Sequence, residues 1–385
     1  MPIYFDHAAT TPISEVAISA LNNQIKKLGN ASSLHSAGRS VRKDLESARE
    51  EIAKAIDCAP SEVIFTATGT EANNLAIKGL YWKAAKSNRN VIITSTFEHH
   101  AVMDPIAWLA EHENAQVINI NVDRNGFILM DELAQAIKDN QDKVAFISIM
   151  HSNNEVGTIQ DIAKVVKIAG DIPVHADCVQ SFGKVALSFK DLGLTAATIS
   201  AHKVGGPLGV AALILKRGLD IEPILHGGGQ ERDIRSGTFN APSIVSFAAA
   251  AKESVAAIAD RDKKVRALKS ELIQTVKKNV SDAWVNGDQV NCLPGITSIT
   301  FPKTDSEGLL LLLDSEGIAC STGSACSAGV QRPSHVLLAM GLTEDETTST
   351  LRFSVSHSNT LTEIAKLGSV IASVVARSRA ASGKK

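Results

Sequence analysis

The sequence predicts an α/β fold in which helices cover a mostly parallel sheet, with a smaller α+β domain towards the C-terminus. Three observations support this prediction. The chain is 385 residues long, 44% of its residues are hydrophobic, and short segments rich in β-branched residues alternate with helical segments. A chain of this length exceeds what one hydrophobic core usually supports, and βαβ alternation is typical of a parallel sheet between helices.

The strands expected in the large domain are short, and several end in polar or glycine-rich segments. They are Glu62–Ala67, Asn90–Ser95, Ala115–Ile120, Lys143–Met150, Ile172–Asp177, Ala196–Ser200 and Gly209–Leu215. Helical stretches separate many of them, for instance Glu71–Lys86 and Met130–Asp139.

The pattern changes towards the C-terminus. From Ala241 to about Val280 it is helical and charged, which predicts one long helix leading out of the large domain. Strand-like and helix-like segments follow at residues 296–301, 306–318 and 349–356. These segments predict the smaller α+β domain.

Composition argues against several classes of protein. With 39 basic and 41 acidic residues, the charge balance indicates neither a nucleic-acid nor an anionic-membrane partner. Residues 1–20 show no signal peptide, and the purest apolar run, Leu309–Leu313, is far shorter than the roughly 20 residues of a membrane helix. We therefore expect a cytoplasmic protein without a membrane span.

The five cysteines do not suggest a disulfide framework or a zinc site. No C-x-x-C pair occurs, so we expect reduced thiols at Cys58, Cys178, Cys292, Cys320 and Cys326.

The end of the expected strand Glu62–Ala67 is a candidate phosphate site. Thr68, Gly69 and Thr70 follow it, and we expect the next helix to begin at Glu71. Free backbone N–H groups and a hydroxyl at a helix N-terminus form a phosphate cradle. Taken alone, Thr70 is more simply an N-cap, which any helix favours. The pattern G-x-x-x-x-G-K-[ST] is absent, so a nucleoside triphosphate is not indicated.

A carboxylate ends another strand. Asp177 closes the nearly apolar segment Ile172–Asp177, and Gln180 lies just beyond it. Because burial of an unpaired charge is costly, Asp177 needs a partner. A buried backbone amide or a helix N-terminus is the simpler partner, and the protonated ring nitrogen of a cofactor would serve equally well.

A lysine ends a third strand. Lys203 follows Ala196–Ser200 and precedes a glycine-rich turn. A lysine that loses hydration there has a lowered pKa, and its neutral amine can form a Schiff base with an aldehyde. A structural ion pair or an exposed loop position is the alternative. Together, the cradle, the acid and the lysine are the protein groups that pyridoxal phosphate requires.

Several longer motifs resemble those of one family. They are YFDHAATTP, NASSLHSAGR, TGTEANNLAIKG, EHHAV, MHSNNEVGTIQDI, HADCVQSFGK, SAHKVGGPLG, HGGGQERDIRSGT, STGSACSAG, PSHVL and LRFSVS. In this order they resemble the cysteine desulfurases of the class V aminotransferase superfamily, of the type that serves iron–sulfur cluster assembly and nitrogen fixation. The resemblance runs from residue 4 to about residue 357 and implies a pyridoxal-phosphate fold-type-I domain. It implies an N-terminal segment at residues 1–15 packing with the small domain, a large domain at 16–255 and a small domain at 256–385.

The resemblance also implies roles for single residues around the cofactor ring. Lys203 would carry the cofactor, Asp177 would pair with the pyridine nitrogen, and His99 would stack on the ring and move protons at the substrate thiol. Asn154 and Gln180 would approach the ring oxygen.

Further positions are assigned to the phosphate and the substrate. The phosphate would be held by Gly69, Thr70, Ser200, His202 and, from the second subunit of a homodimer, Thr238. Arg352 would hold the substrate carboxylate with a forked pair of hydrogen bonds, a geometry that favours Arg over Lys. Asn30 would help at the same carboxylate.

Cys326 is the expected acceptor of sulfur. It lies in a run of small residues at about 320–332, which predicts a mobile loop. The resemblance implies that L-cysteine becomes L-alanine and that the sulfur forms a persulfide on Cys326. An acceptor protein for iron–sulfur assembly or tRNA thiolation would then take it, with Cys326 a possible transient iron–sulfur ligand.

Other functions remain open from the sequence. A selenocysteine lyase or an aminotransferase-like enzyme would share Lys203 and Asp177 but would need no loop thiol. A scaffold that binds an iron–sulfur cluster through its cysteines is a non-enzymatic alternative, whereas a dehydrogenase lacks its G-x-G-x-x-G motif. Cys178 is ambiguous, and Cys320 is expected to be structural. Most of the remaining histidines are also expected to be structural: His35, His100, His112, His151, His226, His335 and His357.

Overall fold

The computed structural model describes residues 2–323 and 333–383. Its largest sheet has seven strands in the order β2-β8-β7-β6-β5-β3-β4. Their bounds are β2 Val63–Thr66, β3 Val91–Ser95, β4 Gln116–Ile120, β5 Val144–Ser148, β6 Val174–Asp177, β7 Ala196–Ser200 and β8 Ala211–Leu215. From β7 to β4 every neighbouring pair is parallel, whereas β8 is antiparallel to both β2 and β7. The mostly parallel sheet expected from the alternation is confirmed.

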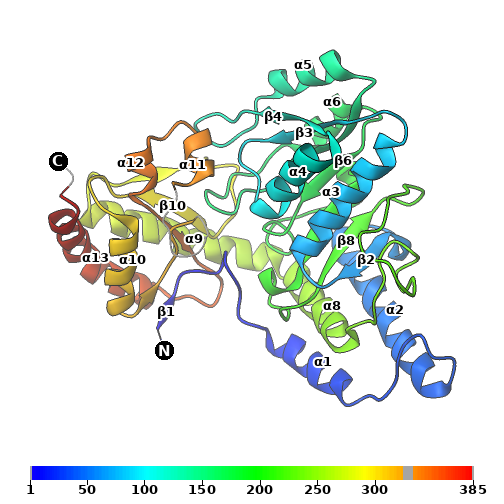
Figure 1. The fold of residues 1–385 in the computed structure, drawn as a ribbon. Coiled ribbons are helices and arrows are strands. Elements are labelled where there is room, and N and C mark those ends of the chain that lie inside the picture. The colour runs from blue at the N-terminus through cyan, green and yellow to red at the C-terminus, as the bar shows by residue number, and fades with distance from the viewer. Residues whose placement is uncertain (1, 324–332, 384–385) are drawn as a thin grey trace.

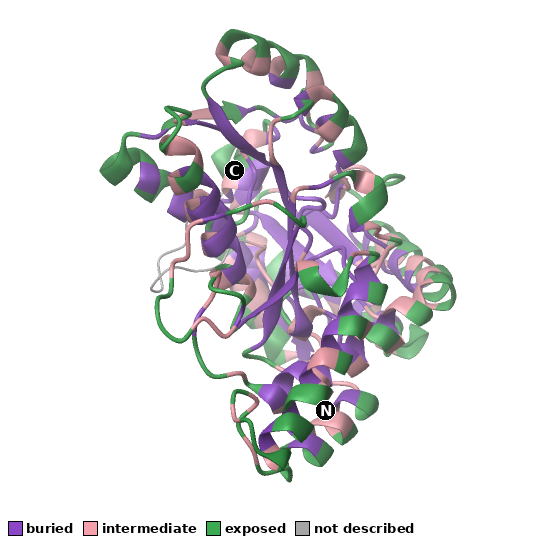
Figure 2. Cartoon of the chain, turned by 90° about the vertical axis from the view of Figure 1, so that its right-hand side faces the viewer, coloured by how far each residue is buried: buried purple, intermediate pink, exposed green. Residues whose placement is uncertain are grey.

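Helices cover both faces of this sheet, as Figures 1 and 2 show. The helices that precede the small lobe are α1 Glu15–Ile25, α2 Ser36–Ile56, α3 Gly69–Ala85, α4 His100–Glu113, α5 Met130–Asn140, α6 Ile162–Ala169, α7 Phe189–Leu192 and α8 Ala241–Ala256, with 3-10 turns at Pro60–Glu62 and Ala201–Lys203. Apolar residues of α3 and α4 form one buried cluster with the sheet, and residues of α2, α5, α6 and α8 form another. Most strands of this sheet are buried along their whole length, which explains why they are almost continuously apolar.

Most of the remaining elements form a smaller lobe with its own buried cluster, whereas Val336 and Leu337 of α11 belong to the buried cluster of α2, α5, α6 and α8. Its antiparallel sheet has the order β12-β10-β9, and a two-stranded parallel sheet joins β1 to β11. The remaining elements are β1 Ile3–Tyr4, α9 Ile258–Asn279, β9 Trp284–Asn286, β10 Ile296–Thr300, α10 Ser306–Ser315, β11 Ile318–Ala319, α11 His335–Ala339, α12 Glu344–Thr347, β12 Thr350–Ser354 and α13 Leu361–Ser382. The N-terminal segment thus crosses to the lobe that contains the C-terminus.

The single helix expected from Ala241 to about Val280 is wrong, because the structure divides it into α8 and α9. The division lies at Ala257, whose φ of −97° and ψ of 4° depart from helical values. Helix α8 packs against α1 and α2, whereas α9 packs against α13 of the smaller lobe. The division therefore lies where the chain passes from one core to the other.

A second correction concerns the start of α3. The helix begins at Gly69 rather than Glu71, because the side chain of Thr68 accepts the backbone N–H of Glu71 and caps the helix there. Thr70 is consequently inside the first turn and is not the N-cap. Among the described residues, no helix is both long and apolar enough to cross a membrane.

Candidate active site

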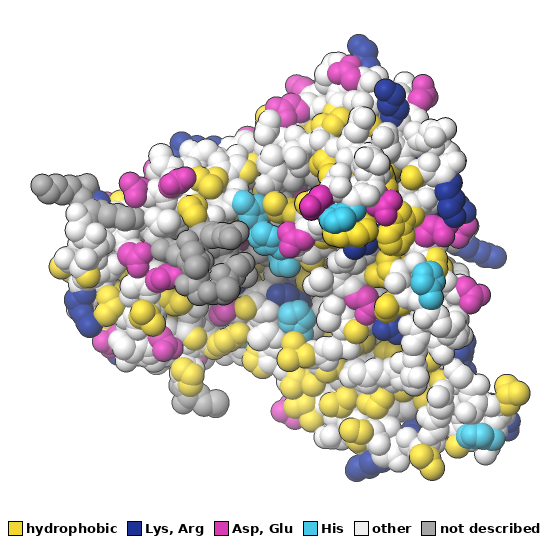
Figure 3. Space-filling model, in the orientation of Figure 1, with side chains coloured by type: hydrophobic (Ala, Val, Ile, Leu, Met, Phe, Trp, Pro, Cys, Tyr) yellow, Lys and Arg dark blue, Asp and Glu magenta, His cyan; other side chains and the backbone are white. Residues whose placement is uncertain are grey.

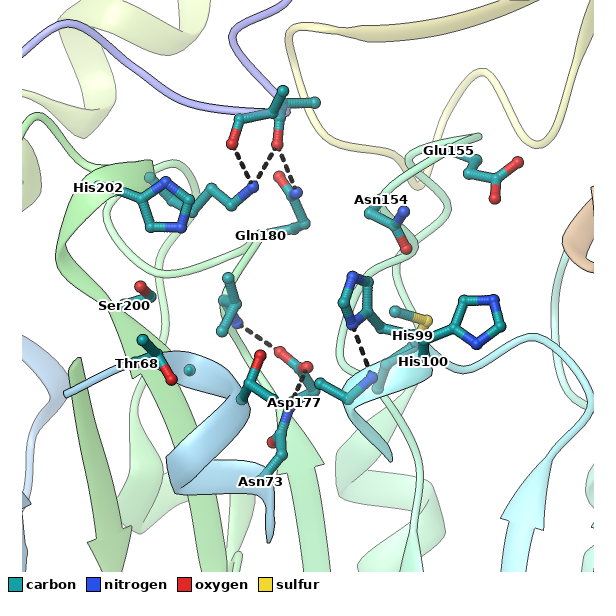
Figure 4. Close-up of a pocket in the computed structure, with 18 of the residues that line it drawn as sticks. Thr68, Asn73, His99, His100, Asn154, Glu155, Asp177, Gln180, Ser200 and His202 are labelled. Carbon is teal, nitrogen blue, oxygen red and sulfur yellow. Dashed lines mark hydrogen bonds between the residues drawn. The ribbon is translucent and has the colours of Figure 1, made fainter. Parts of the chain in front are cut away.

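A cavity of about 520 Å³ lies where the carboxyl ends of the parallel strands face the smaller lobe. Figure 4 shows its lining residues, and Figure 3 shows histidine and basic side chains gathered between the two lobes. The predicted residues that line it are Gly69, Thr70, His99, Asn154, Asp177, Gln180, Ser200, His202, Lys203 and Arg352. Segments far apart in the chain meet here because parallel strands end at one edge of a sheet.

Lys203 reaches the cavity from the turn after β7. Its Nζ donates to the carbonyl oxygens of Ala8 and Ala9, at 2.6 and 2.7 Å. Burial, followed by the positive charge of Arg352, lowers the pKa of Lys203 to about 8. A substantial fraction of this amine is therefore neutral, and nucleophilic, at mildly alkaline pH.

Asp177 ends β6 at the floor of the cavity. Its Oδ2 accepts from Asn73 Nδ2 at 2.8 Å, and its Oδ1 accepts from the backbone N–H of Val179 at 2.9 Å. These two bonds fix the plane of the carboxylate. Each oxygen retains acceptor capacity, so Asp177 can also accept from a protonated nitrogen in the cavity.

The N-terminus of α3 supplies the donors expected of a phosphate cradle. The N–H groups of Gly69 and Thr70 lie in the first helical turn and have no acceptor within the helix. A Cβ built on Gly69 would come 3.3 Å from Val179 Cγ2, so the backbone approaches its neighbours closely there. Burial and then the charge of Lys203 lower the pKa of the nearby His202 to about 4, which leaves this ring neutral.

His99 precedes α4 and serves as its N-cap. Its Nδ1 accepts from the backbone N–H of Ala101 at 3.0 Å, so the proton of the neutral ring is on Nε2. Burial lowers the pKa of His99 and favours this neutral form. The neighbouring Asn154 has a buried Oδ1 for which the described residues supply no hydrogen-bond partner.

Arg352 enters from β12 of the smaller lobe. Its Nη1 donates to the Asn154 carbonyl and its Nη2 to Asp6 Oδ1, each at 2.9 Å. The Nε atom is buried and has no partner among the described residues. Asp6 and Asn154 thereby hold the guanidinium at the edge of the cavity, with N–H groups left for an anion.

Three predicted site residues are not among the residues that line this cavity in the described part of the chain. Asn30 and Thr238 are exposed and do not line it. Cys326, with its expected persulfide and iron–sulfur roles, lies outside the described residues. Of the other thiols, Cys178 and Cys320 are buried, and burial raises the pKa of each, so both favour the unreactive thiol form.

The cavity also contains residues to which the sequence reasoning assigned no function. They are Asn73, His100, Glu155, His335 and the carbonyl groups of Ala8 and Ala9. His100 and His335 lie edge to face at 5.3 Å between ring centroids, and Glu155 accepts from Ser334 Oγ at 2.6 Å. Glu155 directly follows Asn154 and His100 directly follows His99, and these two adjacencies were sequence signals that pointed to these two residues.

Most of the chain is similar to proteins of one family. The family model described as aminotransferase class-V matches residues 3–367. An IscS-like cysteine desulfurase of Mycobacterium tuberculosis is 44% identical and covers 98% of this chain and 97% of its own. A cysteine desulfurase IscS of Dictyoglomus turgidum is 40% identical, and the match covers 92% of this chain and 89% of that protein.

Solved structures agree with these relatives. A NifS-like protein superposes with a TM-score of 0.91 at 33% identity and covers 98% of this chain and all of its own. A NifS-like protein from Rickettsia africae has a TM-score of 0.87 at 33% identity, and the match covers 97% of this chain and 99% of that protein. The chain therefore belongs to the class-V aminotransferase family, whose cysteine desulfurase members depend on pyridoxal phosphate.

Proposed function

We propose that this protein is a cysteine desulfurase that converts L-cysteine to L-alanine and retains the sulfur as a persulfide on Cys326. The relatives named cysteine desulfurase support the reaction over nearly the full chain. The observation that carries the proposal is the meeting of Lys203, Asp177 and the N-terminus of α3 in one cavity. This set supplies an amine, a carboxylate and an anion site at separate positions.

The lining residues fit pyridoxal 5'-phosphate by their chemistry. The free N–H groups of α3 suit the phosphate, the fixed carboxylate of Asp177 suits a protonated ring nitrogen, and the amine of Lys203 suits the aldehyde. The unpartnered Oδ1 of Asn154 and Nε of Arg352 are buried polar atoms that are costly to leave without a ligand. The cavity volume also accommodates a molecule of this size.

We propose Gly69, Thr70, Ser200 and His202 for the phosphate, joined by Thr238 of a second subunit in a homodimer. Asp177, His99, Asn154 and Gln180 would surround the ring, and Lys203 would carry the cofactor. When bound, the cofactor supplies an electron sink that allows a proton to leave the substrate α-carbon.

The chain's own groups would perform the binding and proton-transfer steps. Arg352 binds the substrate carboxylate, and Asn30 assists. Lys203, with a pKa of about 8, can accept and return the α-proton near neutral pH. His99 carries its proton on Nε2 and can donate it near the substrate sulfur.

Cys326 would complete the reaction. Its thiolate attacks the substrate sulfur, and the new sulfur–sulfur bond leaves a persulfide on the protein. The electron pair of the broken carbon–sulfur bond stays with the β-carbon, which takes up a proton as the carbon skeleton becomes alanine. An acceptor protein for iron–sulfur assembly or tRNA thiolation then takes the sulfur, and Cys326 can act as a transient iron–sulfur ligand at that step.

Cys326→Ser tests this assignment directly. We expect the variant to bind pyridoxal phosphate like the wild type but to release alanine from L-cysteine at least about a hundredfold more slowly, because the nucleophile is lost. Cys58→Ser is the matched control and should keep wild-type activity, because burial raises the pKa of the Cys58 thiol to about 12. Undiminished alanine production by Cys326→Ser would rule out this route and favour a lyase that needs no loop thiol.

A further inference from the structure

Lys184 is a second half-buried lysine close to the cavity. It follows Gly183, whose φ of +69° places the chain in the left-handed region, and a Cβ on Gly183 would come 2.8 Å from Val204 Cγ1. Only glycine suits this turn, which directs Lys184 back towards Gln180. The Nζ of Lys184 donates to Gln180 Oε1 at 3.0 Å.

The hydrogen bonds continue from Gln180 to the active lysine. Gln180 Nε2 donates to the Ala8 carbonyl at 2.9 Å, and the same carbonyl accepts from Lys203 Nζ at 2.6 Å. Lys184, Gln180, Ala8 and Lys203 therefore form one connected chain of contacts.

The contacts on either side of Gln180, with Lys184 and with the Ala8 carbonyl, determine the orientation of its amide. A lysine ammonium has only donors, so it requires the amide oxygen, whereas the Ala8 carbonyl requires the amide NH₂. A flipped amide would place donor against donor and acceptor against acceptor. The NH₂ group thus has one N–H on Ala8, and its second N–H is available to the cavity that Gln180 lines.

The environment of Lys184 shows that its placement costs free energy. Burial, followed by the charges of Lys203 and Arg352, lowers the pKa of Lys184 to about 7. Among the described residues, no ion pair joins Lys184 to a carboxylate, and His7 and His202 also face it. In the part of the chain that the structure describes, the one hydrogen bond of the Lys184 side chain is that to Gln180. A costly position with this contact favours a functional role over a structural ion pair.

Lys184 also lines a second cavity of about 380 Å³, which shares Ala8 and Lys203 with the first. This cavity adds further charged or titratable groups, which are Glu15, Glu253, Arg261, Asp262 and His357. Both the charged and the neutral amine of Lys184 have N–H donors, so the contact to Gln180 persists as Lys184 titrates.

We infer that Lys184 is a positioning residue that holds the Gln180 amide with an N–H towards the ring oxygen of the cofactor. This inference rests on the proposed placement of Gln180 beside that oxygen. Without Lys184 the Ala8 carbonyl alone holds the amide, so the N–H facing the ring oxygen is less firmly fixed.

The test uses the cofactor-free full-length protein and two ligands, pyridoxal phosphate and 3-deoxypyridoxal phosphate, which lacks the ring oxygen. Their dissociation constants are measured by calorimetry for the wild type, Lys184→Met, Lys184→Arg and the exposed control Lys190→Met. We expect Lys184→Met to weaken pyridoxal phosphate binding about tenfold and to leave binding of the deoxy analogue unchanged. Lys184→Arg retains donors and should restore most of the preference for the ring oxygen, and Lys190→Met should match the wild type.

Two outcomes would overturn the inference: equal weakening of both ligands by Lys184→Met, or no weakening of either. Gln180→Glu is an independent test if Lys184→Met does not fold, because it keeps a partner for Lys184 but has no N–H for the ring oxygen. It should lose the preference for pyridoxal phosphate over the analogue, and a retained preference would contradict the inference. A wild-type protein that binds neither ligand would instead refute the proposed cofactor site.

Discussion

Burial controls the protonation of single residues around this site. Lys203 was recognisable from the sequence because a lysine at the end of an apolar strand loses hydration. Its acceptors were not recognisable, because the carbonyl groups of Ala8 and Ala9 are brought to it by the fold from the other end of the large lobe's sequence. Asn73, which donates to Asp177, was missed for the same reason.

Glu98, directly before His99, gives a prediction at this scale. It is fully buried, accepts from Ser95 Oγ and from the Met150 N–H, and burial raises its pKa to about 8. Because the folded state binds this proton more tightly than the unfolded state, the stabilising contribution is complete below the unfolded pKa near 4.5 and is lost as pH rises to about 8.

Glu98→Gln keeps the acceptor oxygen but cannot ionise. We expect the stability of the variant, relative to the wild type, to increase between pH 5 and about pH 8, measured by denaturant unfolding at several pH values. Exposed Glu50→Gln is the control and should leave the pH profile unchanged. Parallel profiles for Glu98→Gln and the wild type would show that Glu98 is ionised throughout.

At the scale of elements, the strands and the major helices were predictable because their apolar patterns are regular. The start of α3 and the division between α8 and α9 were not. Thr68 competes with Thr70 as an N-cap on composition alone, and only the contact with Glu71 decides between them. The break at Ala257 contains neither glycine nor proline and follows from packing against two different cores.

One buried ion pair joins elements that were not expected to meet. Arg49 of α2 donates to both carboxylate oxygens of Glu231, at 2.9 and 3.1 Å, and to the Val63 carbonyl at 2.7 Å. This contact anchors the segment that leads to Thr238 and α8. Arg49→Met leaves the Glu231 carboxylate buried without its partner, which costs about 3–5 kcal/mol.

Thermal and denaturant unfolding should show this loss for Arg49→Met. Adding Glu231→Gln to it should restore part of the stability, because the uncompensated charge is removed. Arg42→Met is the matched control, since its pair with Glu46 is exposed and should contribute little. Equal effects of the two arginine substitutions would contradict a special role for the buried pair.

At the scale of the whole molecule, the site requires both lobes and the N-terminal segment. The large lobe supplies Asp177 and Lys203, the smaller lobe supplies Arg352, and the carbonyl groups of Ala8 and Ala9 accept from Lys203. The family motifs predicted which residues gather here, and ten of them line one cavity. Thr238 is exposed in the single chain, as its proposed contact with the cofactor of a second subunit requires.

The central claim is that Lys203 is the amine that carries the cofactor. Borohydride reduction of the pyridoxal-phosphate-loaded protein, followed by peptide mass spectrometry, tests it most directly. The account predicts a pyridoxyl group on Lys203, no such group in Lys203→Ala, and Lys184 unmodified in both proteins. A pyridoxyl group on Lys184 or any other lysine of the wild-type protein would contradict it.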